Sequence, residues 1–406
     1  MKRRAFLGAA LAAAAWPAPG AVATPGPARD FDVMWKEIDE GYAYFDGSSR
    51  ARWRRARDPM RALAARATSP QALAPVLEAA LAQLRDDHVT LIGAEVPGRR
   101  IPYELDIWPR WRGGTATIEA VRTFGDADVA GLHPGQVITR VQGVPIEAAV
   151  RERLGAGAAS VGDMEWALRR AVAGPRIGVQ KLEVREGGRS AAVDLERTPP
   201  APATTPAILG RRMGEQRDIG YIRVRVGAAE PELASQFADA FGHMAGTRAL
   251  IVDLRDTAGQ GSRVETAKIL SHFARPDVPW QLVETRRKPR SAAYLNRERP
   301  GPAYTSPVAV LVNRWTAGEG ESLAAGIAAL AGARLVGTAM AGLHGELYQL
   351  HLGSGLVVAF PARRTFTPDG TPRESMRPEV LVDLAAPSGG PGDPILYQAL
   401  KLFERR

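Results

Sequence analysis

The stretch that decides the fold is Arg314-Trp315-Thr316-Ala317-Gly318-Glu319-Gly320-Glu321, which separates two apolar segments of different character. Before it, residues 307–313 form a short run rich in β-branched residues, typical of a buried strand. After it, residues 323–330 are rich in alanine and have the apolar spacing of a helix. The sequence therefore predicts a strand, a tight turn and a helix in direct succession.

The turn resembles the Thr-x-Ser-x-x-Glu motif of the C-terminal processing, or tail-specific, serine proteases. Thr316 and Glu321 are in register with this motif, and Gly318 stands where the family has its nucleophilic serine. A residue at this point lies at a helix N-terminus, where unpaired N–H groups can hold an oxyanion. Glycine has no side chain and cannot attack a carbonyl group. The resemblance thus implies the fold of a protease and leaves its activity open.

Ser322 is the hydroxyl that follows this position most closely. It would share a helix face with Gly318 but lie about 6 Å further along the axis, at ~1.5 Å rise per residue. A general base placed for position 318 must be within ~3 Å of the atom it serves. We therefore expect Ser322 to bond back to its own helix, with a relocated nucleophile as the alternative.

Further blocks match the same family in the same order. Residues 219–224 resemble the strand that opens the protease core, and residues 249–259 resemble the strand that ends in Asp-Leu-Arg before a glycine loop. Residues 335–342 and 369–380 continue the match. In relatives the glycine loop supplies one oxyanion N–H, which maps onto Gly259, and the residue after the nucleophile supplies another, here Glu319. Gly259 is equally suited to a simple tight turn.

The family has two catalytic arrangements, and the chain matches one of them. The Ser–Lys type has a lysine in a Gly-Lys-Gly setting, but residues 342–345 contain no lysine. The tricorn-like type uses Ser, His and Glu, with the histidine in a Leu-x-Asp-x-His block that residues 84–90 resemble. The resemblance implies that His88 is the base and that Glu374 orients the catalytic apparatus. In the absence of this resemblance, we would interpret His88 as a solvated histidine or as one whose hydrogen bonds are satisfied, and Glu374 as a surface charge.

The N-terminus has the form of an export signal. Arg3 and Arg4 precede an Ala/Leu-rich stretch that runs to Trp16, and residues 21–23 form a small-x-small cleavage site. Paired arginines are typical of a twin-arginine signal. The apolar run is too short for a membrane span. We expect residues 1–23 to be removed and the mature protein to reach the periplasm, or the outside of the cell, without stable membrane insertion.

Composition and residue spacing exclude several kinds of catalytic chemistry and disfavour nucleic acid as a partner. The net charge is +9, and loss of Lys2, Arg3 and Arg4 with the signal leaves +6. The arginine-rich stretch 50–61 favours a solvated helix face, because an exported protein rarely meets nucleic acid. The chain has no cysteine, which excludes thiol nucleophiles and disulfides. Its histidines lack metal-ligand spacing and no phosphate-binding glycine motif follows a strand, so we expect neither a metal nor a cofactor.

The order of the patterns predicts a mixed α/β (α+β) chain. Residues 24–100 are helical, residues 101–200 form a PDZ-like β domain, residues 207–385 form a ClpP/crotonase-like protease core, and residues 386–406 form a connector and a short helix. A proline-rich stretch at 199–206 predicts a stiff linker.

The PDZ resemblance rests on an Ala-Gly-Leu-x-x-Gly pattern that contains Gly131, Leu132 and Gly135. PDZ domains add an extended peptide to a sheet edge and capture its carboxylate. The resemblance therefore implies unstructured or C-terminal peptide segments as partners, and the alternative is a β domain that binds nothing.

Two functions follow from these observations. The first is a working serine peptidase in which Ser322 or another hydroxyl has taken over from residue 318, with His88 as base. The second is an inactive pseudoprotease that binds a peptide or an apolar ligand.

Overall fold

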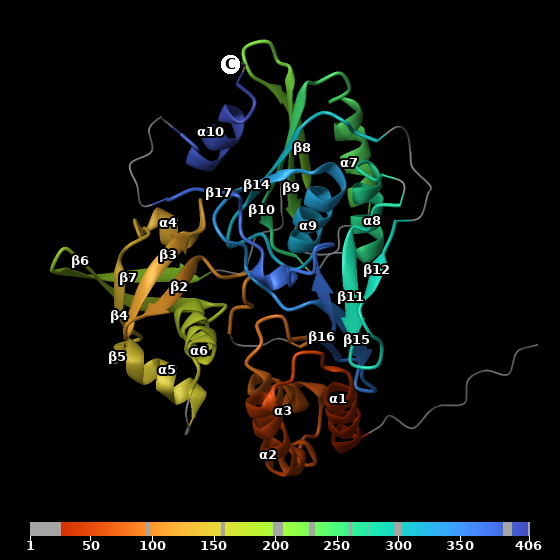
Figure 1. The fold of residues 1–406 in the computed structure, drawn as a ribbon. Helices are drawn as coiled ribbons and strands as arrows, with labels where there is room; N and C mark the ends of the chain where they lie inside the picture. The colour runs from red at the N-terminus through yellow and green to blue at the C-terminus, as the bar shows by residue number, and fades with distance from the viewer. Residues whose placement is uncertain are drawn as a thin grey trace, which may run out of the picture.

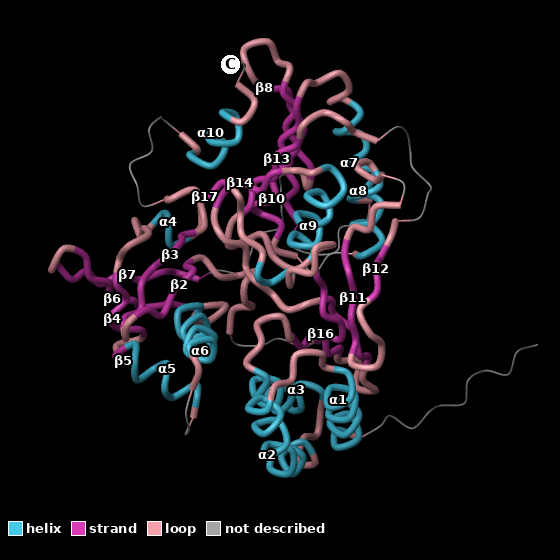
Figure 2. Tube along the Cα trace, in the orientation of Figure 1, coloured by secondary structure: helices cyan, strands magenta, loops and turns pink. Residues whose placement is uncertain are grey.

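The computed structural model describes residues 26–94, 98–155, 159–197, 206–226, 232–259, 262–275, 277–295, 303–384 and 392–404. Within this part of the chain, three β-sheets and the helices around them build a mixed α/β fold (Figures 1 and 2). The predicted export signal and nearly all of the predicted linker lie outside the described residues. No helix among the described residues combines the length and the apolarity that a membrane crossing requires.

The N-terminal helical region contains α1 (Pro27–Gly41), α2 (Gly47–Ala64), α3 (Pro70–Leu81) and the short 3-10 helix η1 (Ala82–Leu84). Side chains cap two of these helices, because Asp46 accepts a hydrogen bond from Ser49 N at 2.7 Å and Ser69 accepts one from Ala72 N at 3.1 Å. The helices bury their apolar faces against one another, and the rings of Trp35 and Trp53 stack with centroids 3.8 Å apart.

This helical region shares its core with the first sheet, so it is not a separate layer. The sheet has the order β1–β16–β11–β12, with β15 also paired to β16. Its strands are β1 (Thr90–Ile92), β11 (Gln281–Thr285), β12 (Ser291–Ala293), β15 (Glu346–His351) and β16 (Val357–Phe366). Val358 and Phe360 of β16 pack into the same hydrophobic cluster as the three helices. The segment between η1 and β1, which carries His88, is therefore anchored at both ends.

The second sheet is antiparallel and has the order β2–β3–β4–β6–β7, with β5 added to β4. Its strands are β2 (Ile107–Arg112), β3 (Thr115–Val121), β4 (Val137–Val141), β5 (Val144–Pro145), β6 (Gly178–Glu186) and β7 (Arg189–Arg197). The helices α4 (Asp126–Val129), α5 (Ile146–Leu154) and α6 (Val161–Ala173) accompany it. Trp166 and Leu168 of α6 pack against Ile107 and Ile118 in one apolar cluster. This unit falls within the predicted PDZ-like region.

The third sheet forms the core, in the order β17–β14–β13–β10–β9–β8. Its strands are β8 (Ile208–Met213), β9 (Ile219–Val226), β10 (Ala249–Thr257), β13 (Val308–Val312), β14 (Arg334–Gly337) and β17 (Val380–Leu381). All neighbours are parallel except β8 and β9. Parallel sheets need cover on both faces.

Helices supply that cover (Figure 1). Helices α7 (Leu233–Gly242), α8 (Arg263–Ser271) and α9 (Glu319–Ala331) pack against one face through Phe237, Ile269 and Ile327. Helix α10 (Pro394–Lys401) packs Ile395 and Ala399 against the other face. The five residues of β13 are all buried, as expected for a strand in the middle of such a sheet.

Candidate active site

The predicted strand–turn–helix is present as β13, residues 313–318 and α9. Hydrogen bonds hold the turn to the end of β10, because Thr316 Oγ1 donates to Leu254 O at 2.9 Å and Ala317 N donates to Thr257 O at 3.0 Å. Gly318 caps α9 with a φ of 57° and a ψ of −110°. Side chains are disfavoured at such a φ, so a glycine suits this turn.

Glu321, the last residue of the motif, fixes the turn from inside. Its carboxylate is fully buried and accepts hydrogen bonds from Gly318 N at 3.0 Å and from Gly342 N at 2.8 Å. Burial raises the pKa of Glu321 to about 6. Glu321 thus connects the start of α9 to the loop 341–345.

His88 is buried, and its ring has a defined tautomer. Its Nδ1 makes a short hydrogen bond to the backbone carbonyl oxygen of His344. A carbonyl oxygen only accepts, so the proton lies on Nδ1 and Nε2 keeps its lone pair. Burial lowers the pKa of His88 to about 4, with a smaller contribution from the positive charge of Arg373. His88 is therefore neutral near pH 7, with Nε2 as an acceptor.

Asp86 organises the segment that carries His88. Its carboxylate accepts hydrogen bonds from Tyr42 Oη at 2.7 Å, from His88 N at 2.8 Å and from His344 Nδ1 at 2.9 Å. Burial favours the neutral carboxyl, but the positive charge of His344 and these hydrogen bonds outweigh it and lower the pKa of Asp86 to about 2. Burial likewise disfavours charge on His344, and Asp86 outweighs it and raises the pKa of His344.

The structure brings His88 and Gly318 together. An ideal Cβ on Gly318 would lie 3.5 Å from His88 Nε2, 3.1 Å from the carbonyl oxygen of Gly259 and 3.9 Å from Tyr103 Oη. A hydroxyl carried by such a Cβ would be within hydrogen-bonding reach of the Nε2 lone pair. His88 Nε2 and residue 318 are thus close enough for the predicted pairing of a base with a nucleophile position, and these roles stay a prediction.

Ser322 is already engaged. Its Oγ accepts a hydrogen bond from Arg373 Nη1 at 2.7 Å and approaches Gly318 O at 3.4 Å, as expected for a hydroxyl that bonds back to its own helix. The side chain is buried. These contacts disfavour the alternative of Ser322 as a relocated nucleophile.

Glu374 lies on the 3-10 helix η2 (Arg373–Ser375) and does not contact His88 by any hydrogen bond in the described part of the chain. Burial raises the pKa of Tyr44, and the negative charge of Glu374 adds to this increase. Burial opposes a raised pKa at His344, where Asp86 gives the largest increase and Glu374 a smaller one. The Tyr44 ring stacks on the His344 ring with centroids 4.1 Å apart. The predicted role of Glu374 in orienting the catalytic apparatus stays a prediction, because its charge affects His344 and Tyr44 and not His88 directly.

The two predicted oxyanion donors, Gly259 and Glu319, direct different backbone groups toward the site or its helix. Gly259 directs its carbonyl oxygen, an acceptor, toward position 318, and residues 260–261 lie outside the described residues. Glu319 opens α9, so its amide belongs to the first turn, where N–H groups lack helical partners. The Glu319 carboxyl accepts a hydrogen bond from Thr266 Oγ1 at 2.8 Å, and burial raises its pKa.

The predicted peptide-binding residues form a turn between α4 and β4. Gly131 N donates to Asp128 O at 2.9 Å, Leu132 N to Ala127 O at 2.9 Å and Gly135 N to Ile118 O at 2.9 Å, while the Leu132 side chain is in the core. Their amides are therefore used inside the unit, and capture of a carboxylate by this turn stays a prediction.

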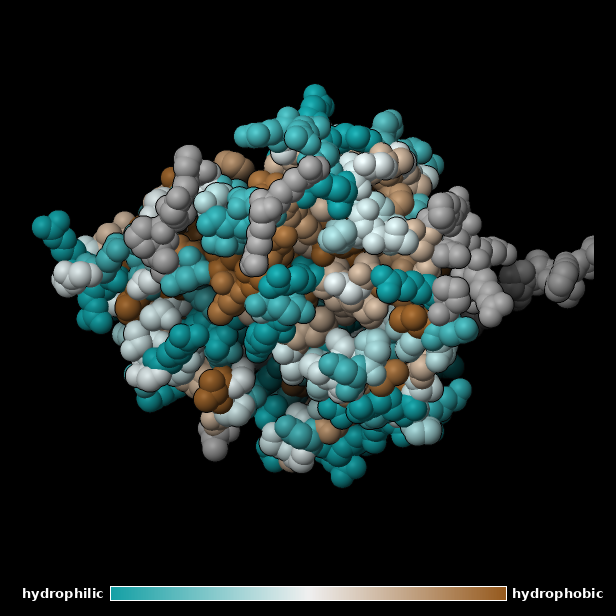
Figure 3. All heavy atoms as spheres, turned by 45° about the horizontal axis from the view of Figure 1, so that its top comes forward, coloured by the Kyte–Doolittle hydropathy of each residue, from teal (hydrophilic) through white to brown (hydrophobic). Residues whose placement is uncertain are grey.

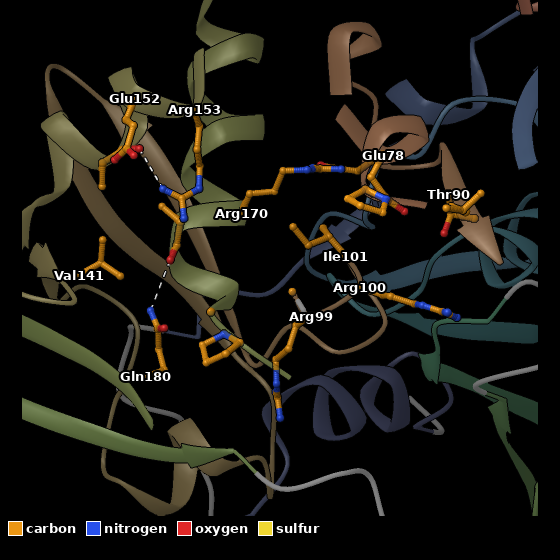
Figure 4. Close-up of a pocket in the computed structure, with 18 of the residues that line it drawn as sticks. Glu78, Thr90, Arg99, Arg100, Ile101, Val141, Glu152, Arg153, Arg170 and Gln180 are labelled. Carbon is orange, nitrogen blue, oxygen red and sulfur yellow. Dashed lines mark hydrogen bonds and ion pairs between the residues drawn. The ribbon is translucent and has the colours of Figure 1, made fainter. Parts of the chain in front are cut away.

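A cavity of about 870 Å³ lies between the helical region and the second sheet (Figure 4), and Gly318 is not among the residues that line it. Glu78 of α3, Arg100, Arg153 of α5 and Arg170 of α6 line it. Its wall includes Asp87, which pairs with Arg169 at 2.6 Å and with Arg170. Ion pairs thus connect Asp87, the residue before His88, to α6. Nowhere in the described residues do three His, Asp or Glu side chains cluster as metal ligands.

Several site residues were not predicted as such from the sequence: Tyr42, Asp86, Tyr103, His344 and Arg373. Asp86 belongs to the block that identified His88, and His344 belongs to the segment that replaces the Gly-Lys-Gly setting, so both stood in motifs already quoted. Tyr42, Tyr103 and Arg373 carry no local signal, because their partners lie far away in the sequence.

The model of peptidase family S41 matches residues 218–382, so the part of the chain that carries the third sheet and the strand–turn–helix is similar to that family. No curated protein sequence matches the chain.

Solved structures of the same fold span nearly the whole chain. The photosystem II D1 C-terminal processing protease has 17% sequence identity, covers 88% of this chain and 94% of its own, and has a TM-score of 0.54. Mature CPAF complexed with lactacystin has 13% identity, with coverage of 93% and 96% and a TM-score of 0.52. A lipoprotein from Streptococcus agalactiae has 13% identity, with coverage of 96% and 98% and a TM-score of 0.52. At these identities the comparison establishes the fold.

Proposed function

We infer that this protein is an exported peptide-binding member of family S41 whose site does not form an acyl-enzyme. The observation that supports this proposal is the Cβ position of Gly318, 3.5 Å from His88 Nε2, because the residue beside the proposed base has no side chain that could act as a nucleophile. Ser322, the hydroxyl that follows Gly318 most closely in the sequence, is bound to Arg373. This contact disfavours the peptidase alternative in which Ser322 replaces the missing nucleophile.

Peptide segments are the proposed ligands because the fold is that of peptidases and because apolar surface is exposed. Figure 3 shows hydrophobic residues gathered in the middle of one face, with hydrophilic residues around them. Exposed large hydrophobic side chains in the described residues include Phe124, Val129 and Leu381. An extended peptide covers such surface while its backbone pairs with a strand edge.

A binding and labelling experiment tests this proposal. A fluorescein-labelled unstructured peptide with a free C-terminal carboxylate should raise its fluorescence anisotropy saturably with the native protein and remain uncut by mass spectrometry. A fluorophosphonate probe should leave the native protein unmodified. The same peptide with a C-terminal amide is the matched control for carboxylate capture. Cleavage of the peptide, or a fluorophosphonate adduct on Ser322, would establish the peptidase instead.

Export is proposed from the N-terminal pattern, which lies outside the described residues. Changing Arg3 and Arg4 together to lysine should strongly reduce the amount of protein that reaches the periplasm, because the folded-protein translocase recognises the paired arginines as an address. Immunoblots of periplasmic and cytoplasmic fractions measure the effect, with Lys2→Arg as the control. An unchanged periplasmic fraction would argue against the twin-arginine route.

A further inference from the structure

The cavity between the helical region and the second sheet combines apolar and charged side chains. Its volume of about 870 Å³ lies in the range of about 300–1,000 Å³ that ligand pockets have. The apolar part of its wall includes Ala74 of α3, Leu91 of β1, Ile101 and Val141 of β4. Figure 4 shows Arg153 and Glu152 on one side of the cavity and Glu78 and Thr90 on the other. A small organic molecule with a charged group suits such a wall.

Arg170 of α6 has only a share of one carboxylate. Asp87 pairs with Arg170 and, at 2.6 Å, with Arg169. Figure 4 shows Arg170 reaching from α6 toward Glu78. Burial raises the pKa of Glu78, while the positive charges of Arg170 and Arg100 act against this increase. The guanidinium group of Arg170 thus keeps positive charge that Asp87 does not fully balance.

Two further arginines of the wall, Arg100 and Arg153, form no ion pair within the described ranges. Arg153 Nη1 donates to the carbonyl oxygen of Ala149 at 3.0 Å. Desolvation lowers the pKa of Arg153, the charge of Glu152 raises it, and the positive charge of Arg170 lowers it. The buried Nε of Arg100 has no hydrogen-bond partner among the described residues. Neighbouring guanidinium groups without their own carboxylates favour an anion between them.

The strands in the wall disfavour an extended peptide as that anion. Strand β1 is at the edge of the first sheet, but the carboxylate of Glu78 forms a hydrogen bond with the backbone of Leu91 there. Strand β4 is paired with β3, β5 and β6, and β5 is only two residues long. A peptide that adds to a sheet needs a free strand edge. The cavity therefore fits a compact molecule better than an extended chain.

We propose that this cavity binds a small carboxylic acid with an apolar body, of the size of a medium-chain fatty acid. The carboxylate of the ligand accepts hydrogen bonds from Arg153 and Arg170, because a guanidinium group offers two parallel N–H donors to a carboxylate. The apolar body packs against Ile101 and Val141, and its burial adds to the affinity. Gly318 does not line this cavity, so the site does not depend on the proposed function.

Isothermal titration calorimetry of the purified protein with sodium octanoate tests this assignment. Octanoate should bind saturably, with one site per molecule and a negative heat-capacity change from apolar burial. Neutral octanamide and cationic octylammonium have the same apolar body and should bind at least ~10-fold more weakly, since they cannot accept charge-assisted hydrogen bonds from the arginines.

Arg153→Gln should weaken octanoate binding at least ~10-fold, because it removes one of the two guanidinium groups that hold the carboxylate. Arg151→Gln is the matched control. Arg151 lies on the same helix, α5, pairs with Glu147 at 2.5 Å and does not line the cavity. This variant loses the same charge and should bind octanoate like the native protein. Equal melting temperatures of the two variants exclude misfolding as the cause of a difference.

Three results would overturn the assignment. The first is the absence of saturable binding at millimolar octanoate. The second is equal affinity for octanoate and octanamide, or unchanged affinity in Arg153→Gln. The third is displacement of octanoate by the unstructured peptide with a free C-terminal carboxylate but not by its C-terminal amide, which would assign the cavity to peptide ends instead.

Discussion

Gly318→Ser should react with a fluorophosphonate at residue 318 at least ~10²-fold faster than the native protein, because a positioned general base contributes about 10²–10⁴-fold. The new Oγ would lie beside His88 Nε2, which is 3.5 Å from the Cβ position and already unprotonated. The His344 carbonyl and Asp86 supply the groups that orient the base. Mass spectrometry of proteolytic fragments locates the modified residue, and the variant should also cut unstructured peptides.

Two features of the turn oppose this gain, and both are small. The φ of 57° makes a side chain strained by about 1–3 kcal/mol, a strain that nucleophile turns in other hydrolases also carry. Gly259 O lies 3.1 Å from the new Cβ and must move by a few tenths of an ångström. Labelling without peptide cleavage would mean that the carbonyl of Gly259 still faces the site, where relatives have an N–H donor.

The controls for this variant separate chemistry from folding. His88→Ala in the Gly318→Ser background should abolish both labelling and cleavage. Gly332→Ser introduces the same residue at a φ of 63° at the opposite end of α9 and should remain unlabelled. A Gly318→Ser protein that melts like Gly332→Ser and yet stays inert would show that the site has diverged beyond its nucleophile position.

The sequence predicted the core well because its signals are local. The change from a β-branched run to an alanine-rich run around residues 314–321 marks β13, the turn and α9, and the structure has all three. The region predicted as helical, residues 24–100, contains α1, α2, α3 and η1. The sequence did not show that the helical region shares a core with β16, because hydrophobic periodicity indicates which face is buried but not what covers it.

The candidate site was predicted only where a motif marked it. His88 was singled out by resemblance to a family block, since a lone histidine after two aspartates has no local signature. The network of Tyr42, Asp86 and His344 joins three distant parts of the chain by hydrogen bonds. Such pairings are set by tertiary packing and leave no periodic trace in the sequence. Arg373, adjacent to the predicted Glu374, holds Ser322 instead, which residue type alone could not decide.

Asp86→Ala should be the most destabilising single change at the site, by about 3–5 kcal/mol. It leaves Tyr42 Oη, His88 N and His344 Nδ1 without their acceptor, and buried donors without partners cost about 1–3 kcal/mol each. Urea unfolding at pH 7 measures the loss, with Asp58→Ala as control because the Asp58 side chain is 90% exposed. Equal midpoints for the two variants would contradict the network.

The pH dependence identifies the carboxylate as the cause. The folded-state pKa of Asp86, about 2, is below its ordinary value of 3.8, so its contribution is present above pH 3.8 and is lost as the pH falls through about 2. That contribution is about 2 kcal/mol, and Asp86→Ala should lack this acid limb. His88, with a pKa lowered from 6.5 to about 4, gives a separate contribution that is lost as the pH falls from 6.5 to 4. This second loss of stability should persist in Asp86→Ala, because the His88 ring stays buried and its protonation below pH 6.5 remains unfavourable in the folded state. If it disappears, the variant has exposed His88 to solvent.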